Sequence, residues 1–173
     1  MHDGNIKLQI EYHHKDCYGW ALHCCHADRE LAQEVLQMAY VKILERQHTF
    51  KAASGFKTWA FAIIKNTAID ACSKQKKSMR LTRSEDNVLD AGYETDGAGV
   101  FDDRLRTLFF AEALNHLPAR QREILQLVFY HDASINQAAE VLNISQGSAR
   151  KHYDRAKKSL SVWFNKKGIS ALQ

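Results

Sequence analysis

The chain contains a single proline, Pro118, among 173 residues, and only eight glycines. Proline and glycine mark turns, and a β-sandwich or barrel needs a turn about every 8–12 residues. Long helices joined by few turns need neither residue. With 45% hydrophobic and 25% charged residues, the chain is also too apolar and too mixed in charge to be disordered. The sequence therefore predicts an all-α protein.

Hydrophobic periodicity predicts helices on both sides of one unusual segment. The pattern is helical from about residue 6 to about residue 83, with a break at residues 49–55, and again from about residue 105 to about residue 165. In the first part, Ala32, Val35, Leu36, Ala39 and Ile43 recur at helical spacing. Between the two parts, residues 84–103 carry seven acids, no base and three glycines. We expect a flexible acidic linker there, joining two small helical domains at residues 1–83 and 104–173.

Several classes of function are excluded by what the sequence lacks. No apolar run reaches the length of about 18 residues that a membrane span requires, and the N-terminus does not resemble a secretory signal. We therefore expect a cytoplasmic protein with reduced cysteines. The sequence has no nucleophile–base arrangement, no phosphate-cradling glycine loop and no paired catalytic carboxylates, so neither an enzyme nor a cofactor is expected.

Histidines and cysteines cluster between residues 13 and 26: His13, His14, Cys17, His23, Cys24, Cys25 and His26. His13 and Cys17 would share one face of a helix, as zinc ligands can. Neither a CxxC pair nor an HExxH motif is present, however. Small thiols and imidazoles on a partly buried helix are the favoured interpretation, without a metal, and a thiol or metal sensor is kept as an alternative.

A helix-turn-helix is predicted between residues 134 and 160. Ser134 can cap a short helix, Asn143 stands at a turn where a positive φ is common, and Ser145 can cap the second helix. Pro118 suits the first turn of a preceding helix, where its missing N–H costs nothing. On the second helix an apolar face is formed by Ala149, Tyr153, Ala156 and Leu160. A different face is basic and consists of Lys151, Arg155 and Lys158, with Arg150 beside them. Charged faces are often merely solvated, but this position favours insertion into a DNA major groove.

A polar stripe is predicted on the helix that begins near Phe56. Asn66, Asp70, Lys74 and Lys77 follow one another at helical spacing, and the stripe ends in a basic run. Such a stripe can hold a phosphate backbone, with Asn66 bonding to an exposed base. It can equally be a solvated face above a core that contains Trp59. Composition alone leaves these two interpretations open.

Four segments follow one another along the chain, at residues 32–45, 56–70, 117–124 and 144–158. Together they resemble segments of the extracytoplasmic-function group of bacterial RNA polymerase sigma factors. Residues 32–45 are similar to the core-polymerase-binding helix, and residues 56–70 to the promoter-melting segment. Residues 117–124 resemble the start of the fourth conserved region, and residues 144–158 the recognition helix. The chain departs from the family at Gln37-Met38, where an adjacent Gln-Glu is usual, and at Ala149, where a β-branched residue is usual.

The resemblance implies a sigma factor that binds core RNA polymerase and directs promoter recognition, DNA melting and transcription initiation, without bond chemistry. Residues 1–83 would be a region 2 domain for core polymerase and the minus-ten element, and residues 104–173 a region 4 domain for the minus-thirty-five element. The implied partners are core RNA polymerase and promoter DNA, both duplex and non-template single strand, with no membrane insertion. The sequence leaves open whether an anti-sigma factor is a further partner.

The resemblance also implies site residues. It assigns polymerase contacts to Glu34, Leu36, Gln37 and Tyr40. It assigns DNA contacts to Lys65, Asn66, Asp70, Lys74, Lys77, Ser148, Arg150, Lys151, Arg155 and Lys158. The base contacts do not transfer from the family, because Asp154 places an acid beside the reading face. The alternative is a free-standing helix-turn-helix regulator that binds duplex DNA as a dimer, which would leave residues 56–70 without a role.

Overall fold

The computed structural model describes residues 3–51, 55–82 and 111–168. All regular secondary structure in these ranges is helical, which confirms the predicted all-α class. Contacts divide the chain into two compact units, Met1–Gly92 and Tyr93–Gln173, and each is described by itself. The acidic segment 84–103 lies outside the described residues. None of the helices in the described ranges has both the length and the apolar character needed to cross a membrane.

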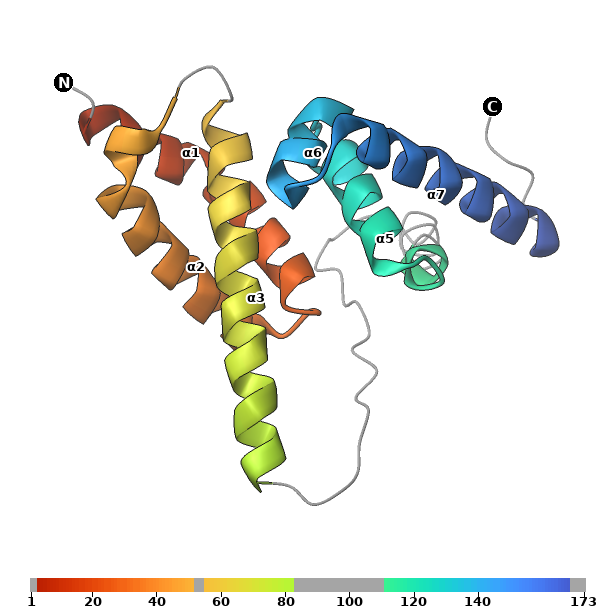
Figure 1. Cartoon of the computed structure of the whole chain (residues 1–173), viewed down its shortest axis with the longest axis horizontal. Helices are drawn as coiled ribbons and strands as arrows, with labels where there is room; N and C mark the ends of the chain where they lie inside the picture. Colours follow the sequence, from red (N-terminus) through yellow and green to blue (C-terminus); the bar gives the residue numbers. More distant parts are fainter. Residues whose placement is uncertain (1–2, 52–54, 83–110, 169–173) are drawn as a thin grey trace, which may run out of the picture. The chain divides into compact units, whose positions relative to one another are not determined.

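Three helices pack against one another in the N-terminal unit: α1 (Asp3–Cys24), α2 (Arg29–Glu45) and α3 (Phe56–Thr82), with a 3₁₀ turn η1 (Gln47–Thr49) after α2 (Figure 1). The predicted stripe of α2 is confirmed, because all five of its residues are buried. At the centre of the unit, Trp20 of α1 is fully buried. Its indole N–H donates to the carbonyl oxygen of Phe61 at 3.1 Å, and its ring stacks on that of Phe61. The largest core side chain is therefore buried with its polar atom satisfied.

The turn between α1 and α2 was not predicted, since the sequence pattern indicated no break before residue 49. His26 and Ala27 adopt φ values of 53° and 64° there. Asp28 then caps α2 by accepting a hydrogen bond from the Leu31 N–H at 3.0 Å. Neither residue with positive φ is a glycine, so the usual sequence mark of a helix end is missing at this turn.

Two polar contacts fasten α3 to its neighbours. The ammonium group of Lys57 lies 3.0 Å from the carboxylate of Asp16 on α1. The Nζ atom of Lys42 on α2 donates to the hydroxyl of Thr67 at 3.1 Å, and that hydroxyl donates to the carbonyl of Ile63. Beyond these contacts α3 extends past the ends of α1 and α2, and residues 73–80 are exposed (Figure 1).

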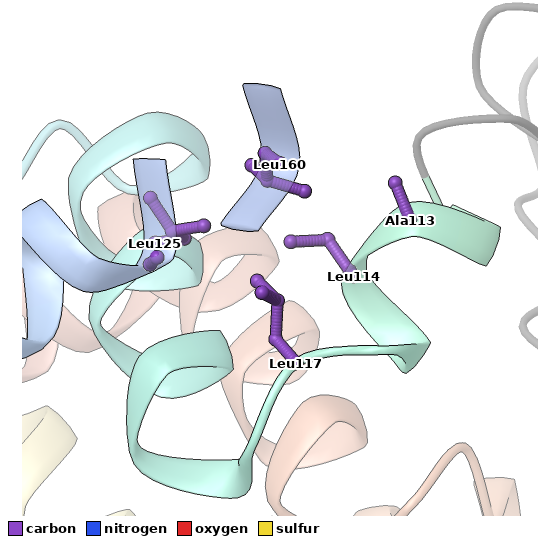
Figure 2. Close-up of a cluster of buried hydrophobic side chains, with 6 residues drawn as sticks. Ala113, Leu114, Leu117, Leu125 and Leu160 are labelled. Atoms are coloured by element: carbon purple, nitrogen blue, oxygen red, sulfur yellow. The ribbon is translucent and has the colours of Figure 1, made fainter. Parts of the chain in front are cut away.

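The C-terminal unit is also built from helices. Residues 111–115 are helical. They are followed by α5 (Ala119–Leu125), a π-helical turn η3 (Gln126–Tyr130), α6 (Ile135–Leu142) and α7 (Gln146–Lys166). In its core, Leu114 and Leu117 point toward Leu160 of α7 (Figure 2). The cluster comprises Ala113, Leu114, Leu117, Leu125, Ala156 and Leu160. It fixes α7 along the face opposite its charged residues.

The local signals of the helix-turn-helix are confirmed. Ser134 forms a capping box with Gln137, and Ser145 caps α7 by accepting from the Ser148 N–H. Asn143 adopts a left-handed conformation with φ and ψ both 51°. Pro118 stands immediately before α5 rather than inside its first turn. The π-helical turn that ends α5 was not predicted.

Candidate nucleic-acid interface

The exposed face of α7 is basic. Lys151, Arg155 and Lys158 are all exposed, whereas Ala149, Ala156 and Leu160 are buried. Because an α-helix turns by about 100° per residue, the three cations share an arc opposite the buried residues. The structure therefore brings these three predicted DNA-binding residues together on one face of the second helix of the helix-turn-helix.

Arg150 and the acid Asp154 lie to one side of the basic face. Arg150 is exposed, but it lies about 100° around the helix from Lys151 and so on the flank of the basic face. The carboxylate of Asp154 lies 3.7 Å from the Nζ atom of Lys157. Lys157 in turn lies over the ring of Tyr153, 4.5 Å from its centroid. A flanking lysine therefore lies next to the acid beside the basic face.

The first turn of α7 is held by a pair of serines. Ser148 is half-buried, its N–H donates to the hydroxyl of Ser145 at 3.1 Å, and the two hydroxyls lie 2.9 Å apart. The structure thus gives Ser148, a predicted DNA contact, a role in the cap. Gly147 is exposed beside it, and a Cβ there would meet nothing within 4 Å. The backbone of this turn is consequently open to a close approach by a phosphate.

The polar stripe on α3 is present, but Lys65, a further predicted DNA contact, lies away from it. Asn66, Asp70, Lys74 and Lys77 are all exposed. Lys65 is only 7% exposed, because the side of α3 on which it lies faces the rest of the unit. It is therefore not brought together with the stripe. Lys76 belongs to the same basic run and Arg80 follows it; both are exposed near the end of α3, although neither was among the predicted DNA contacts.

Aromatic rings gather at the start of α3. Phe50 lies 5.1 Å from Trp59 and 6.1 Å from Phe56, measured between ring centroids. Trp59 is half-buried, and at a spacing of i, i+7 it shares a face with Asn66. The sequence placed Trp59 in the core in one of its two interpretations of this helix, and in neither did it pair Trp59 with Asn66 on one surface. The spacing of seven residues between Trp59 and Asn66 would have indicated that both lie on one face of the helix.

The predicted polymerase contacts on α2 are not all at the surface. Glu34 and Gln37 are exposed, but Leu36 is 4% exposed and belongs to the core. Tyr40 is half-buried toward α1, with its hydroxyl 2.9 Å from Nδ1 of His14. Burial raises the pKa of Tyr40. Sequence reasoning missed the exposed apolar residues on the outer face of α2, namely Met38, Val41 and Leu44. Val41 is 55% exposed and lies at the centre of this face.

The cluster of histidines and cysteines is spread over buried and exposed positions. Cys17, His23 and Cys25 are buried, whereas His14 and His26 are exposed. Within the described part of the chain, no group of three or more His, Cys, Asp or Glu side chains is arranged to hold a metal ion. All four cysteines are free thiols.

Comparison with known proteins gives matches over both units. Residues 9–78 match the family Sigma-70 region 2, and residues 110–160 match the family Sigma-70, region 4. The ECF RNA polymerase sigma factor SigX of Bacillus subtilis (strain 168) is 27% identical over 160 residues, which cover 90% of this chain and 81% of SigX. RNA polymerase sigma factor SigV of the same organism is 27% identical over 139 residues, covering 80% of this chain and 79% of SigV.

Two solved structures share the fold. The sigma factor RpoE from Bartonella quintana, in complex with the anti-sigma factor NepR, matches with a TM-score of 0.71 at 23% identity, covering 93% of this chain and 97% of that one. CnrH, in complex with the cytosolic domain of CnrY, matches with a TM-score of 0.62 at 20% identity, covering 93% and 88%. With both sigma-70 regions matched in order and sigma factors as its relatives, the chain belongs to the extracytoplasmic-function group of RNA polymerase sigma factors.

Proposed function

We propose that the two units of this sigma factor hold the two elements of a promoter. Residues 1–83 bind core RNA polymerase and the minus-ten element, and residues 104–173 bind the minus-thirty-five element. The observation that carries the proposal is the surface of α3, where exposed Asn66 lies between the aromatic rings near Trp59 and an exposed basic tail. A free-standing helix-turn-helix regulator has no use for this surface, and the match of region 2 does not favour that alternative.

On α7, the basic face would dock in the major groove of the upstream element. Lys151, Arg155 and Lys158 can reach phosphates and base edges from one arc of the helix. The cap of Ser145 and Ser148 fixes the first turn, and Gly147 leaves its backbone open. Phosphate contacts by these cations position the helix, and base-edge contacts select the sequence.

On α3, the stripe would capture the non-template strand once the duplex opens. Extruding a base costs a few kcal/mol, and stacking on an aromatic ring returns about 1–3 kcal/mol per base. The ring of Trp59 can supply that stacking, and the amide of Asn66 can both donate to and accept from a base edge. Lys74 and Lys77 then neutralise the backbone phosphates downstream along the helix.

On α2, the outer face would dock on core polymerase. Val41, Met38 and Leu44 supply an exposed apolar centre, and Glu34 and Gln37 supply polar contacts at its edge. Such an arrangement of an apolar centre with a polar rim is typical of protein interfaces. Leu36 and Tyr40 act indirectly in this proposal, since they pack α2 onto its own unit.

The chain acts by binding alone in this proposal and is not an enzyme. Its place of action is that of core RNA polymerase, the cytoplasm. Of the two structures whose fold it shares, RpoE was solved in complex with the anti-sigma factor NepR, and CnrH in complex with the cytosolic domain of CnrY. On that basis an anti-sigma factor is a further proposed partner.

The test is the substitution Asn66→Ala, with Gln75→Ala as its matched control. Gln75 is also an exposed amide on α3, but it lies on the opposite side of the helix. Each variant is combined with core polymerase and promoter DNA, and unpaired thymines are detected with permanganate. N66A is expected to form holoenzyme normally and to lose at least about tenfold in open complex, while Q75A behaves as wild type. Equal open-complex formation by N66A would overturn the assignment.

A further inference from the structure

Two cysteines from distant parts of the sequence meet beside the turn that follows α1. Cys25 lies in that turn and is buried, and Cys72 lies on α3 and is half-buried. The sulfur of Cys72 lies 4.0 Å from the carbonyl oxygen of Cys24. The side chains of Cys25 and Cys72 also interact through a hydrogen bond that raises the pKa of Cys25. The two thiols are therefore neighbours between α3 and the turn that follows α1.

The other two cysteines are placed differently. Cys17 is fully buried, and its sulfur is hydrogen-bonded by the side chain of Tyr40. Cys24 adjoins Cys25 in sequence, but it meets Cys72 through its backbone carbonyl. Among the four thiols, Cys25 and Cys72 are thus the pair whose side chains interact with each other.

We propose that Cys25 and Cys72 form a reversible disulfide when the protein meets a hydroperoxide, which cross-links α3 to the turn between α1 and α2. The proposal uses a cluster that the function of a sigma factor leaves unexplained. It does not depend on how the protein contacts polymerase or promoter DNA.

Cys72 is the nucleophile of the pair. Its thiolate is favoured by Lys76, one turn further along α3, and by the hydrogen bond from Cys25, while Asp28 opposes ionisation of both thiols. The thiolate attacks one peroxide oxygen, the O–O bond breaks, and the departing hydroxide or alkoxide takes up a proton. Cys25 then attacks the resulting sulfenic acid, the S–S bond forms, and water leaves. In total, two thiols are oxidised and the hydroperoxide is reduced to water and an alcohol, or to two waters if it is hydrogen peroxide.

The burial of Cys25 and Cys72 also sets the rate at which a hydroperoxide oxidises them. Burial raises the pKa of Cys72 and raises that of Cys25 to about 12, so both thiols are protonated near neutral pH. Because the thiolate is the reacting form, oxidation should be slow at neutral pH and rise by about tenfold per pH unit below the pKa of Cys72. A peroxide-dependent response of this kind requires sustained exposure rather than trace oxidant.

The test is peptide mapping of the full chain after treatment with hydrogen peroxide, with remaining thiols blocked before trypsin digestion. The expected product joins residues 16–29 to residues 66–74, and fragmentation of the joined pair assigns the link to Cys25 and Cys72. Dithiothreitol should reverse it. The unmodified chain and the oxidised chain are also compared by thermal unfolding, where the disulfide should raise the midpoint by at least about 5 °C.

Matched variants decide which sulfurs react. C24S removes the neighbouring thiol and should leave the cross-link intact, whereas C25S and C72S should each abolish it. The proposal would be overturned if the thiols of Cys25 and Cys72 both persisted under peroxide. It would also be overturned by a link from Cys24 to Cys72, or by joined peptides that arise only between two chains. The mapping of the wild-type chain decides the matter even if a serine variant folds poorly.

Discussion

Asn143 shows how one residue sets the geometry of the helix-turn-helix. It adopts a left-handed conformation, and its N–H and that of Ile144 bond to carbonyls in the last turn of α6. This conformation was predictable because the chemistry is local: Asn tolerates positive φ, and the flanking serines cap helices. His26 and Ala27 also have positive φ, at a turn that was missed because neither residue is the glycine or asparagine that usually marks a helix end.

Substitutions at Asn143 should follow backbone strain. Asn143→Val should lower the free energy of unfolding of the C-terminal unit by about 1–2 kcal/mol, since a β-branched residue clashes at positive φ. Asn143→Gly should be neutral or stabilising, because glycine adopts this conformation without cost. Chemical denaturation of both variants measures the difference. A valine variant as stable as the glycine variant would contradict this account of the turn.

His13 gives the N-terminal unit a dependence on pH. Its ring stacks on that of Phe56, and burial, followed by the nearby charge of Lys57, lowers its pKa below the usual 6.5, although Asp16 opposes the shift. The unfolded chain therefore binds a proton at a pH where the folded chain does not. The free energy of unfolding should fall as the pH drops through 6.5 and stop falling below the folded pKa.

The substitution His13→Phe isolates that effect. It keeps an aromatic ring against Phe56 and removes the titrating group. Denaturation of wild type and variant at about pH 7.5 and about pH 5.5 should show a smaller loss of stability in the variant. An equal loss in both proteins would exclude His13 as the source.

At the scale of elements, the sequence predicted the helix starts and the apolar spacing within helices better than it predicted which side chains are buried. The buried stripe of α2, the start of α3 and the caps of α6 and α7 were all predicted, because each depends on local spacing. Leu36 and Lys65 were assigned to interfaces by resemblance, yet the structure buries both. A matching motif aligns residues along the chain, but it does not determine which face of a helix is buried. That face depends on the packing of all three helices.

Arg155 tests the basic face of α7. Arg155→Ala should weaken binding of the holoenzyme to the upstream promoter element by about 1–3 kcal/mol, because the residue lies at the exposed centre of the face. Lys157→Ala is the control, since Lys157 lies on the flank beside Asp154 and Tyr153. Footprinting over the upstream element measures both. Equal occupancy by R155A and wild type would remove this face from the DNA interface.

At the scale of the whole molecule, the net charge of +4 is an average over strongly opposed segments. Residues 74–83 carry five bases and no acid, and residues 145–173 carry seven bases and one acid. The acidic segment 84–103 offsets them. The described parts of both basic segments lie on exposed helix surfaces, at the end of α3 and along α7. The charges of single segments therefore indicated the basic surfaces better than the net charge of the chain did, because surface charges act on partners locally.

Val41 tests the docking of α2 on polymerase. Val41→Glu places a charge at the centre of the proposed apolar contact and should weaken binding to core polymerase by at least about tenfold. Leu8→Glu is the matched control, because Leu8 is an apolar residue on α1 that is 64% exposed, against 55% for Val41. Binding is measured with purified core enzyme in the absence of DNA. If both variants bind equally well, the outer face of α2 is not the contact.

Transcription by purified core polymerase from a library of genomic fragments tests the central claim most directly. With the chain added, transcripts should begin at discrete new sites. The DNA upstream of those sites should share two sequence elements at a constant separation, one for each unit of the protein. Absence of chain-dependent start sites, together with binding of the chain alone to palindromic duplex DNA, would contradict the account.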